Sequence, residues 1–203
     1  IITGTILLGL AASGPQIGTK VKQVERRGID LVIALDTSVS MDAKDVVPSR
    51  LKKAKFELSQ LIKSLNGDRV SIIVFAGTSF LYLPLTSDYE AAILFLNQID
   101  TKMIASQGTN LSSAINTAVS AFTNDFDKHK VMLIVSDGED HEGQSVDLAK
   151  KASKNGFIIH TVGVGSSMGG LIPLVGDNLS FKYKKDKSNK LITTVLNKEI
   201  LKD

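Results

Sequence analysis

Short apolar runs alternate with amphipathic segments along most of the chain. Four runs, at residues 30–35, 70–75, 131–135 and 157–162, consist mainly of Val, Ile, Leu and Phe. Such runs are typical of strands that are buried on both faces of a parallel sheet. Segments with apolar residues three or four positions apart lie between them and predict helices that each cover one face. The alternation predicts an α/β fold, a doubly wound and mainly parallel central sheet with helices on both faces.

Local signals predict where some elements begin and end. Pro48 stands where a first helical turn can start, since a missing N–H does no harm there. Pro84 is expected to stop a short strand at 80–83, and Ser87-Asp88 can cap the helix that follows. His160 falls within the fourth apolar run and is predicted to be a core residue.

The two ends of the chain predict further segments. Residues 1–12 are apolar and uncharged but shorter than the roughly 20 residues that cross a bilayer, and we interpret them as the end of a transmembrane helix. The alternative is an apolar segment that docks on the domain. Residues 13–28 are then a linker or docking segment, and residues 29–203 form one domain.

Near the C-terminus the pattern is weaker. It predicts a hairpin over 172–183 that turns at 176–178, then a strand at 191–196. A final helix is expected to start at 197–202 and to be cut short by the end of the chain.

Composition narrows the classes of function. A net charge of +3 gives no broad basic field, so we expect no nucleic-acid partner. The absence of cysteine excludes disulfides, zinc-thiolate sites and cysteine nucleophiles. Gly163 to Met168 lacks the third glycine of a dinucleotide-binding loop, and no phosphate-binding P-loop is present.

Oxygen-bearing side chains stand at three of the predicted junctions between elements. The first core strand ends in a D-x-S-x-S motif made of Asp36, Ser38 and Ser40. Thr109 directly precedes a predicted helix, and Asp137 follows the third core strand. The carboxyl ends of parallel strands meet at one edge of a sheet, so these side chains are expected to lie together.

Hydroxyl and carboxylate oxygens are the ligands of hard cations, so this set predicts a site for Mg²⁺, with Mn²⁺ or Ca²⁺ as alternatives. A site with few direct charges leaves the ion electrophilic, and a carboxylate from a protein partner can complete its coordination. The plainer interpretation is that these residues only cap loops. It leaves unexplained why three separate junctions carry oxygen ligands.

The five residues match, in order, the metal ion-dependent adhesion site (MIDAS) of von Willebrand factor A-type (VWA) domains. By that resemblance, Ser38, Ser40 and Thr109 contact the metal directly or through water. Asp36 and Asp137 act largely through bound waters and orient the hydroxyls.

Longer stretches resemble the bacterial aerotolerance-operon (Bat-type) VWA proteins of the membrane. They are residues 13–18, 35–51, 74–88, 108–111 and 136–143. The resemblance implies anchoring in the bacterial cytoplasmic (inner) membrane with the VWA domain in the periplasm. It also implies that the partners include other Bat-type proteins and a MoxR-type AAA+ ATPase, with a link to oxidative-stress tolerance. Val39 departs from the glycine that is common in the VWA motif, which can change the conformation of the loop.

Three functions follow from this reading. The leading hypothesis is a metal-dependent protein-binding module with no catalytic residues. One alternative is a structural subunit of a membrane complex in which the metal only braces the loops. The other is a metal-dependent hydrolase using Asp36 and Asp137, which is disfavoured because two-metal hydrolases need several bridging carboxylates. The acidic run from Glu139 to Glu142 is predicted to be a solvated rim, with a second metal site or a site for a basic partner as the alternatives.

Overall fold

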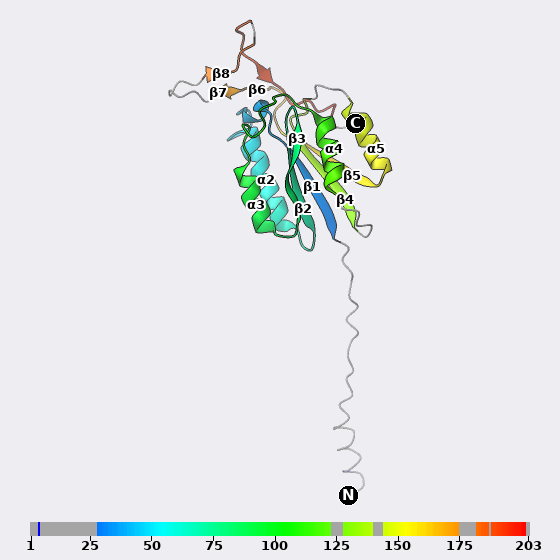
Figure 1. Cartoon of the computed structure of the whole chain (residues 1–203). Helices are drawn as coiled ribbons and strands as arrows, with labels where there is room; N and C mark the ends of the chain where they lie inside the picture. The colour runs from blue at the N-terminus through cyan, green and yellow to red at the C-terminus, as the bar shows by residue number, and fades with distance from the viewer. Residues whose placement is uncertain are drawn as a thin grey trace.

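The structure, a computed structural model, describes Gly4 and residues 28–122, 128–139, 144–174, 182–186 and 188–201. Its central sheet has the spatial order β3-β2-β1-β4-β5 (Figure 1). β1 pairs in parallel with β2 and β4, β4 pairs in parallel with β5, and β3 is antiparallel to β2. The strands are β1 (Ile29–Asp36), β2 (Arg69–Phe75), β3 (Ser79–Thr86), β4 (His129–Ser136) and β5 (Phe157–Gly163). The predicted α/β fold with a mainly parallel sheet is confirmed.

Helices cover both faces of this sheet. The helices α2 (Arg50–Ser64) and α3 (Tyr89–Gln98) pack on one face, where they meet Leu31, Ile33 and Leu35 of β1. The helices α4 (Leu111–Ala121) and α5 (Ser145–Lys154) pack on the other, where Val32 and Ala34 of the same strand point. Successive strand residues alternate between faces, so the unbroken apolar run of β1 fills both cores at once. The doubly wound arrangement is therefore as predicted.

The connections place a topological switch beside the central strand. After β1 the chain passes through α2 to β2 on one side, and it later returns through α4 to β4 on the other side of β1. In open α/β sheets, ligands bind outside the carboxyl ends of the strands at such a point. The ends of β1 and β4 are thus where a site is expected.

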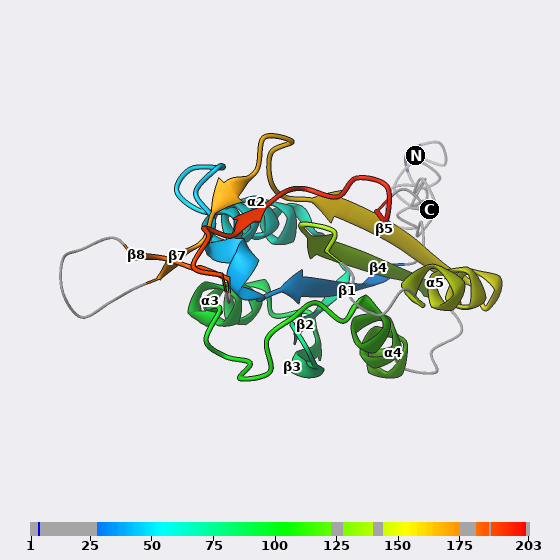
Figure 2. The same ribbon diagram turned by 90° about the horizontal axis from the view of Figure 1, so that it is seen from above.

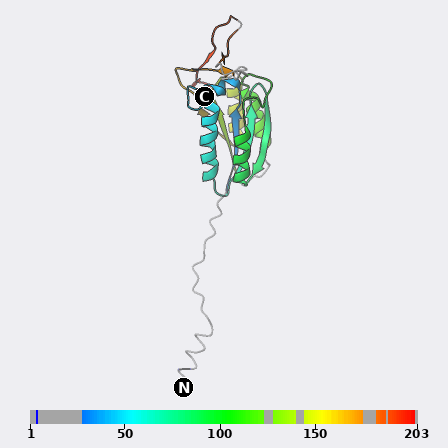
Figure 3. The same ribbon diagram turned by 90° about the vertical axis from the view of Figure 1, so that its left-hand side faces the viewer.

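Short elements lie over this carboxyl edge (Figures 1 and 3). They are the 3-10 helix η1 (Val39–Asp42) and two ribbons, β6 (Gly170–Leu171) with β9 (Thr193–Thr194), and β7 (Pro173–Leu174) with β8 (Lys182–Tyr183). The pairing of β7 with β8 confirms the predicted hairpin, whose turn at 176–178 lies outside the described residues. The strand predicted at 191–196 is reduced to β9, and residues 198–201 form a turn instead of the helix start predicted for 197–202.

Three other predictions are wrong. α2 begins at Arg50, because the hydroxyl of Ser49 accepts a hydrogen bond from the Lys52 N–H (3.3 Å) and so makes Ser49 the N-cap. β3 continues through Pro84 to Thr86, since an edge strand does not need every N–H for pairing. His160 is exposed because β5 is the last strand of the sheet at its edge.

The predicted transmembrane segment at 1–12 lies, apart from Gly4, outside the described residues, as does most of the linker at 13–28. None of the helices in the described ranges combines the length and apolarity needed to cross a membrane.

Candidate functional site

Two buried carboxylates stand side by side where the two central strands end. Asp36 is the last residue of β1, and Asp137 directly follows Ser136, the last residue of β4. The register pairs Leu35 with Val135, so the two strands end together. Asp36 and Asp137 are both fully buried.

The D-x-S-x-S loop is folded around Asp36. One carboxylate oxygen of Asp36 accepts a hydrogen bond from the Ser38 N–H (2.8 Å), and the other accepts one from the Ser136 hydroxyl (2.6 Å). The hydroxyls of Ser38 and Ser40 lie 2.8 Å apart and so converge on one point. The Ser136 hydroxyl in turn accepts a hydrogen bond from the Gly138 N–H (3.1 Å), which joins this loop to the end of β4.

The loop that carries Thr109 is held at the same edge. The N–H of Gly77, just after β2, donates to the carbonyl of Ser106 (2.9 Å). The Gln107 side chain accepts a hydrogen bond from the Val39 N–H (3.2 Å), so it bridges directly to the D-x-S-x-S loop. Thr109 is buried. The structure therefore brings the loops of all five predicted residues to one edge, with Thr109 on the loop that Gln107 joins to η1.

The pKa of Asp36 is shifted by its surroundings. Burial, together with the nearby charge of Asp137, raises the pKa of Asp36 to about 7, although the hydrogen bonds from Ser136 and Ser38 act in the opposite direction. Two ionised carboxylates in a buried site are unfavourable without a compensating cation. The edge thus has a local excess of negative charge.

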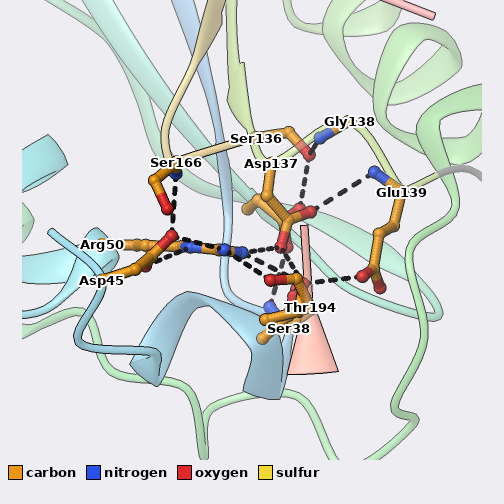
Figure 4. Close-up of polar contacts among 11 residues, drawn as sticks. Ser38, Asp45, Arg50, Ser136, Asp137, Gly138, Glu139, Ser166 and Thr194 are labelled. Carbon is orange, nitrogen blue, oxygen red and sulfur yellow. Dashed lines mark hydrogen bonds and ion pairs between the residues drawn. The ribbon is translucent and has the colours of Figure 1, made fainter. Parts of the chain in front are cut away.

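Arg50, which was not among the residues predicted from the sequence, provides part of that compensation. Its guanidinium lies between Asp45 and Asp137, with the side chain 0% exposed (Figure 4). It donates from Nε and Nη2 to the two oxygens of Asp45 (both 2.8 Å) and from Nη1 to Asp137 (2.9 Å). It also donates to the hydroxyl and the carbonyl of Thr194 (both 3.0 Å). One signal was available, because Arg50 precedes Ala54 and Leu58 by four and eight residues and so shares their buried helix face.

The ion pair shifts the pKa values of both Asp45 and Arg50. Burial alone would raise the pKa of Asp45, but hydrogen bonds from Arg50 and from the Ser166 N–H (2.8 Å) lower it to about 2. Burial would likewise lower the pKa of Arg50, but Asp45 and Asp137 raise it above its ordinary value. Arg50 is therefore a permanent cation inside the site.

Residues 193–197, here called the C-terminal strap, cross the edge beside these groups. The Thr194 hydroxyl contacts Glu139 (2.7 Å) and Asp137 (3.4 Å), and the Asn197 N–H donates to the carbonyl of Asp137 (2.9 Å). Gly138 has φ +80°, and a Cβ there would lie 2.2 Å from the carbonyl oxygen of Asn197. Figure 2 shows the strap, in red, beside the carboxyl end of β5. Glu139 is half-buried and accepts a hydrogen bond from the strap, and the rest of the predicted solvated rim, residues 140–142, lies outside the described ranges.

The donor set fits a hard cation. It consists of the converging hydroxyls of Ser38 and Ser40, the hydroxyl of Thr109 and two carboxylates. Within the described ranges, no three His, Cys, Asp or Glu side chains are grouped so that they could hold a metal ion. A metal at this edge would therefore depend on hydroxyl oxygens and water, as Mg²⁺ commonly does.

Comparison with known sequences and structures agrees with this description. Residues 31–139 match the family model of the von Willebrand factor type A domain. The crystal structure of the conserved hypothetical protein BatB from Bacteroides thetaiotaomicron is 42% identical, with a TM-score of 0.82 over 86% of this chain and 83% of that one. An aerotolerance-related membrane protein from Bacteroides fragilis is 41% identical, with a TM-score of 0.81 over 86% of this chain and 85% of that one.

A curated relative is longer than this chain. A UPF0353 protein from Mycolicibacterium paratuberculosis is 27% identical over 194 residues, which are 90% of this chain and 57% of the relative. The chain thus spans little more than half the length of that protein.

Proposed function

Because this chain belongs to the von Willebrand factor type A domain family, we propose that it is the divalent-metal-dependent protein-binding domain of a membrane-anchored, Bat-type bacterial protein. The observation that carries this proposal is the convergence of the Ser38 and Ser40 hydroxyls beside the buried carboxylates of Asp36 and Asp137. Buried carboxylates of this kind need a cation, and hydroxyls at this spacing offer it neutral oxygen ligands. We assign no catalytic residue.

In this proposal Ser38, Ser40 and Thr109 hold the ion, and Asp36 and Asp137 orient the hydroxyls and the bound waters. Mg²⁺ is the ion that the oxygen donors favour, with Mn²⁺ or Ca²⁺ as substitutes. When bound, the ion supplies a Lewis-acidic position that attracts a carboxylate. The protein supplies few direct negative charges, so a carboxylate from a partner is attracted strongly.

The surroundings of the site suit a protein partner. Val47 and Met168 are 81% and 89% exposed on two loops at the carboxyl edge. These loops are joined by the hydrogen bond from the Ser166 N–H to Asp45 (2.8 Å). Exposed apolar side chains beside a polar centre are typical of interaction surfaces. The partner is therefore proposed to carry an acidic residue flanked by apolar ones.

The cellular setting is part of the proposal. One solved relative is described as an aerotolerance-related membrane protein, and we extend membrane anchoring to the protein that contains this chain. We place it in the bacterial cytoplasmic (inner) membrane with the domain on the periplasmic side. Other Bat-type proteins and a MoxR-type AAA+ ATPase are the proposed partners, in a complex for aerotolerance or envelope stress.

Two measurements test the metal and the partner separately. Titration calorimetry with Mg²⁺ and Mn²⁺ compares the wild type with a Ser38→Ala/Ser40→Ala variant. The control is a Ser64→Ala/Ser120→Ala variant, in which two exposed hydroxyls that contact only their own helices are removed. Metal binding is expected in the wild type and the control, and its absence from both would refute the proposal.

Capture from solubilised membranes then uses the same three proteins with Mg²⁺ or with EDTA. A Bat-type partner retained only by the wild type and the control, and only with Mg²⁺, supports metal-bridged adhesion. Equal retention under all conditions would leave the metal as a brace of the loops and place the binding surface elsewhere.

A further inference from the structure

We propose that Arg50 sets the affinity of the candidate metal centre. Its buried guanidinium is a fixed positive charge that offsets Asp137, so that the cation is held weakly and stays attractive to a partner's carboxylate. The inference rests on the proposed function. It adds to the expected ligand set a residue that acts on the metal through Asp137 and not by contact.

The geometry keeps the guanidinium in place. Asp45 accepts hydrogen bonds from Nε and Nη2, each at 2.8 Å, and Asp137 accepts one from Nη1 at 2.9 Å. Nη1 and Nη2 also donate to the hydroxyl and the carbonyl of Thr194. The backbone of Gly165 lies close to the guanidinium, with φ +147° and a position where a Cβ would lie 3.0 Å from the Arg50 Cζ. A planar guanidinium held by these contacts cannot swing out of the site when a second cation arrives.

The charges decide the direction of the effect. The affinity of oxygen-ligand sites for divalent cations rises with the number of negative charges among their groups. Asp36 and Asp137 supply that charge here, and Arg50 is in direct contact with one of them. All three side chains are buried, so water screens them little and a single charge has a large effect. Removing the guanidinium charge should therefore make metal binding tighter.

A purely structural role predicts the reverse. If Arg50 only holds Asp137 in position, then its removal frees the carboxylate and metal binding weakens. The sign of the change in affinity thus separates a charge effect from a brace, without reference to partner binding.

The experiment measures the dissociation constants of Mg²⁺ and Mn²⁺ by titration calorimetry, and the rise in melting temperature that each metal causes. Arg50→Gln removes the charge. Because it removes the ion-pair partner of Asp45, the double variant Arg50→Gln/Asp45→Asn removes both charges of the pair and keeps the folded state accessible. Arg69→Gln is the matched control, since its partner Asp30 (2.6 Å) lies at the opposite, amino end of β1.

Arg50→Gln is expected to bind Mg²⁺ about tenfold more tightly than the wild type and to gain more melting temperature from it. The double variant is expected to bind more tightly than the wild type by a smaller factor, because it also loses the negative charge of Asp45 on the far side of the guanidinium. Arg69→Gln is expected to keep the wild-type dissociation constant. Weaker or unchanged binding in the double variant would overturn the inference. The wild type reports on the proposed function independently: if it binds no metal while an Arg50 variant does, the inference stands and the proposed function fails. If none of the proteins binds metal, both are overturned.

Discussion

Replacing Asp36 with asparagine should stabilise the metal-free domain while it abolishes the response to metal. The change removes one of two neighbouring buried charges and keeps the shape of the side chain. The amide oxygen can still accept the hydrogen bond from the Ser38 N–H, and the amide nitrogen then faces the Ser136 hydroxyl. The site is therefore relieved of repulsion and loses its attraction for a cation.

The magnitude follows from the pKa of Asp36. Burial, with the charge of Asp137, raises that pKa from 3.8 to about 7 in the folded chain. Ionising Asp36 in the folded, metal-free domain thus costs at most about 4 kcal/mol more than in the unfolded chain. Because the amide forms a poorer hydrogen bond with Ser136, the expected net gain is about 1–3 kcal/mol.

The metal-free wild type is expected to lose stability as the pH rises toward 7. The folded pKa lies above the unfolded one, so the folded wild type binds more protons between about pH 4 and pH 7. The contribution of Asp36 to the free energy of unfolding therefore falls as the pH rises through this range, and it stays low at higher pH. The variant has no such fall, so its advantage should be small near about pH 4.5 and largest near about pH 8.

Urea unfolding near these two pH values, with EDTA and with Mg²⁺, measures the effect. In the wild type at the higher pH, Mg²⁺ at about 100 times its dissociation constant should restore about 3 kcal/mol, and in Asp36→Asn it should restore nothing. Glu57→Gln, an exposed acid paired with Lys53 on α2, is the control and should change stability by less than about 0.5 kcal/mol. An equal gain at both pH values, or a variant that Mg²⁺ still stabilises, would refute the reasoning.

Three further changes probe the surroundings of the site. Gly138→Ala should lower the free energy of unfolding by about 2–4 kcal/mol in urea denaturation, because it combines a left-handed backbone with a clash against the C-terminal strap. The control Gly67→Ala has the similar φ of +83° but open space around it, and it should cost only about 1 kcal/mol. The pKa of Asp45 is lowered to about 2, so ionised Asp45 stabilises the folded state above about pH 4, and this stabilisation is lost as the pH falls toward 2. Acid unfolding followed by circular dichroism should show a loss of about 2 kcal/mol in the wild type that is absent in Asp45→Asn. Leu96→Ala should shift the urea midpoint by the equivalent of about 2–5 kcal/mol because Leu96 is fully buried, and an equal shift in Leu94→Ala, where the side chain is 59% exposed, would contradict this account of the core.

Most of the sheet could be predicted from the sequence, because strands that are buried on both faces consist almost entirely of apolar residues. The runs that became β1, β2 and β4 contain almost no polar residue inside the sheet. The antiparallel direction of β3 follows from a connection of three residues after Phe75, which is far too short for a parallel crossover. The exposure of His160 could not be read from its own segment, since it depends on the position of β5 in the strand order.

In the candidate site too, features set by neighbouring residues could be predicted from the sequence, whereas contacts between distant residues could not. Asp36, Ser38 and Ser40 are close in sequence and carry a recognisable spacing, whereas their role as metal ligands stays a prediction. The contacts of Arg50 could not be inferred, because its partners Asp137 and Thr194 lie 87 and 144 positions away. An arginine on a buried helix face shows only that an anion must be near, and the fold decides which one.

The central place of β1 fixes how long the site keeps its shape. β1 is hydrogen-bonded to a strand on each side along its length, and Asp36 is its last residue. Amide protons of such a strand exchange with solvent only when the whole domain unfolds. The carboxylate and the loop that it holds therefore keep their arrangement. Under the proposed function, a partner would meet a loop that is already ordered, and little conformational entropy would be lost on the domain's side of the contact.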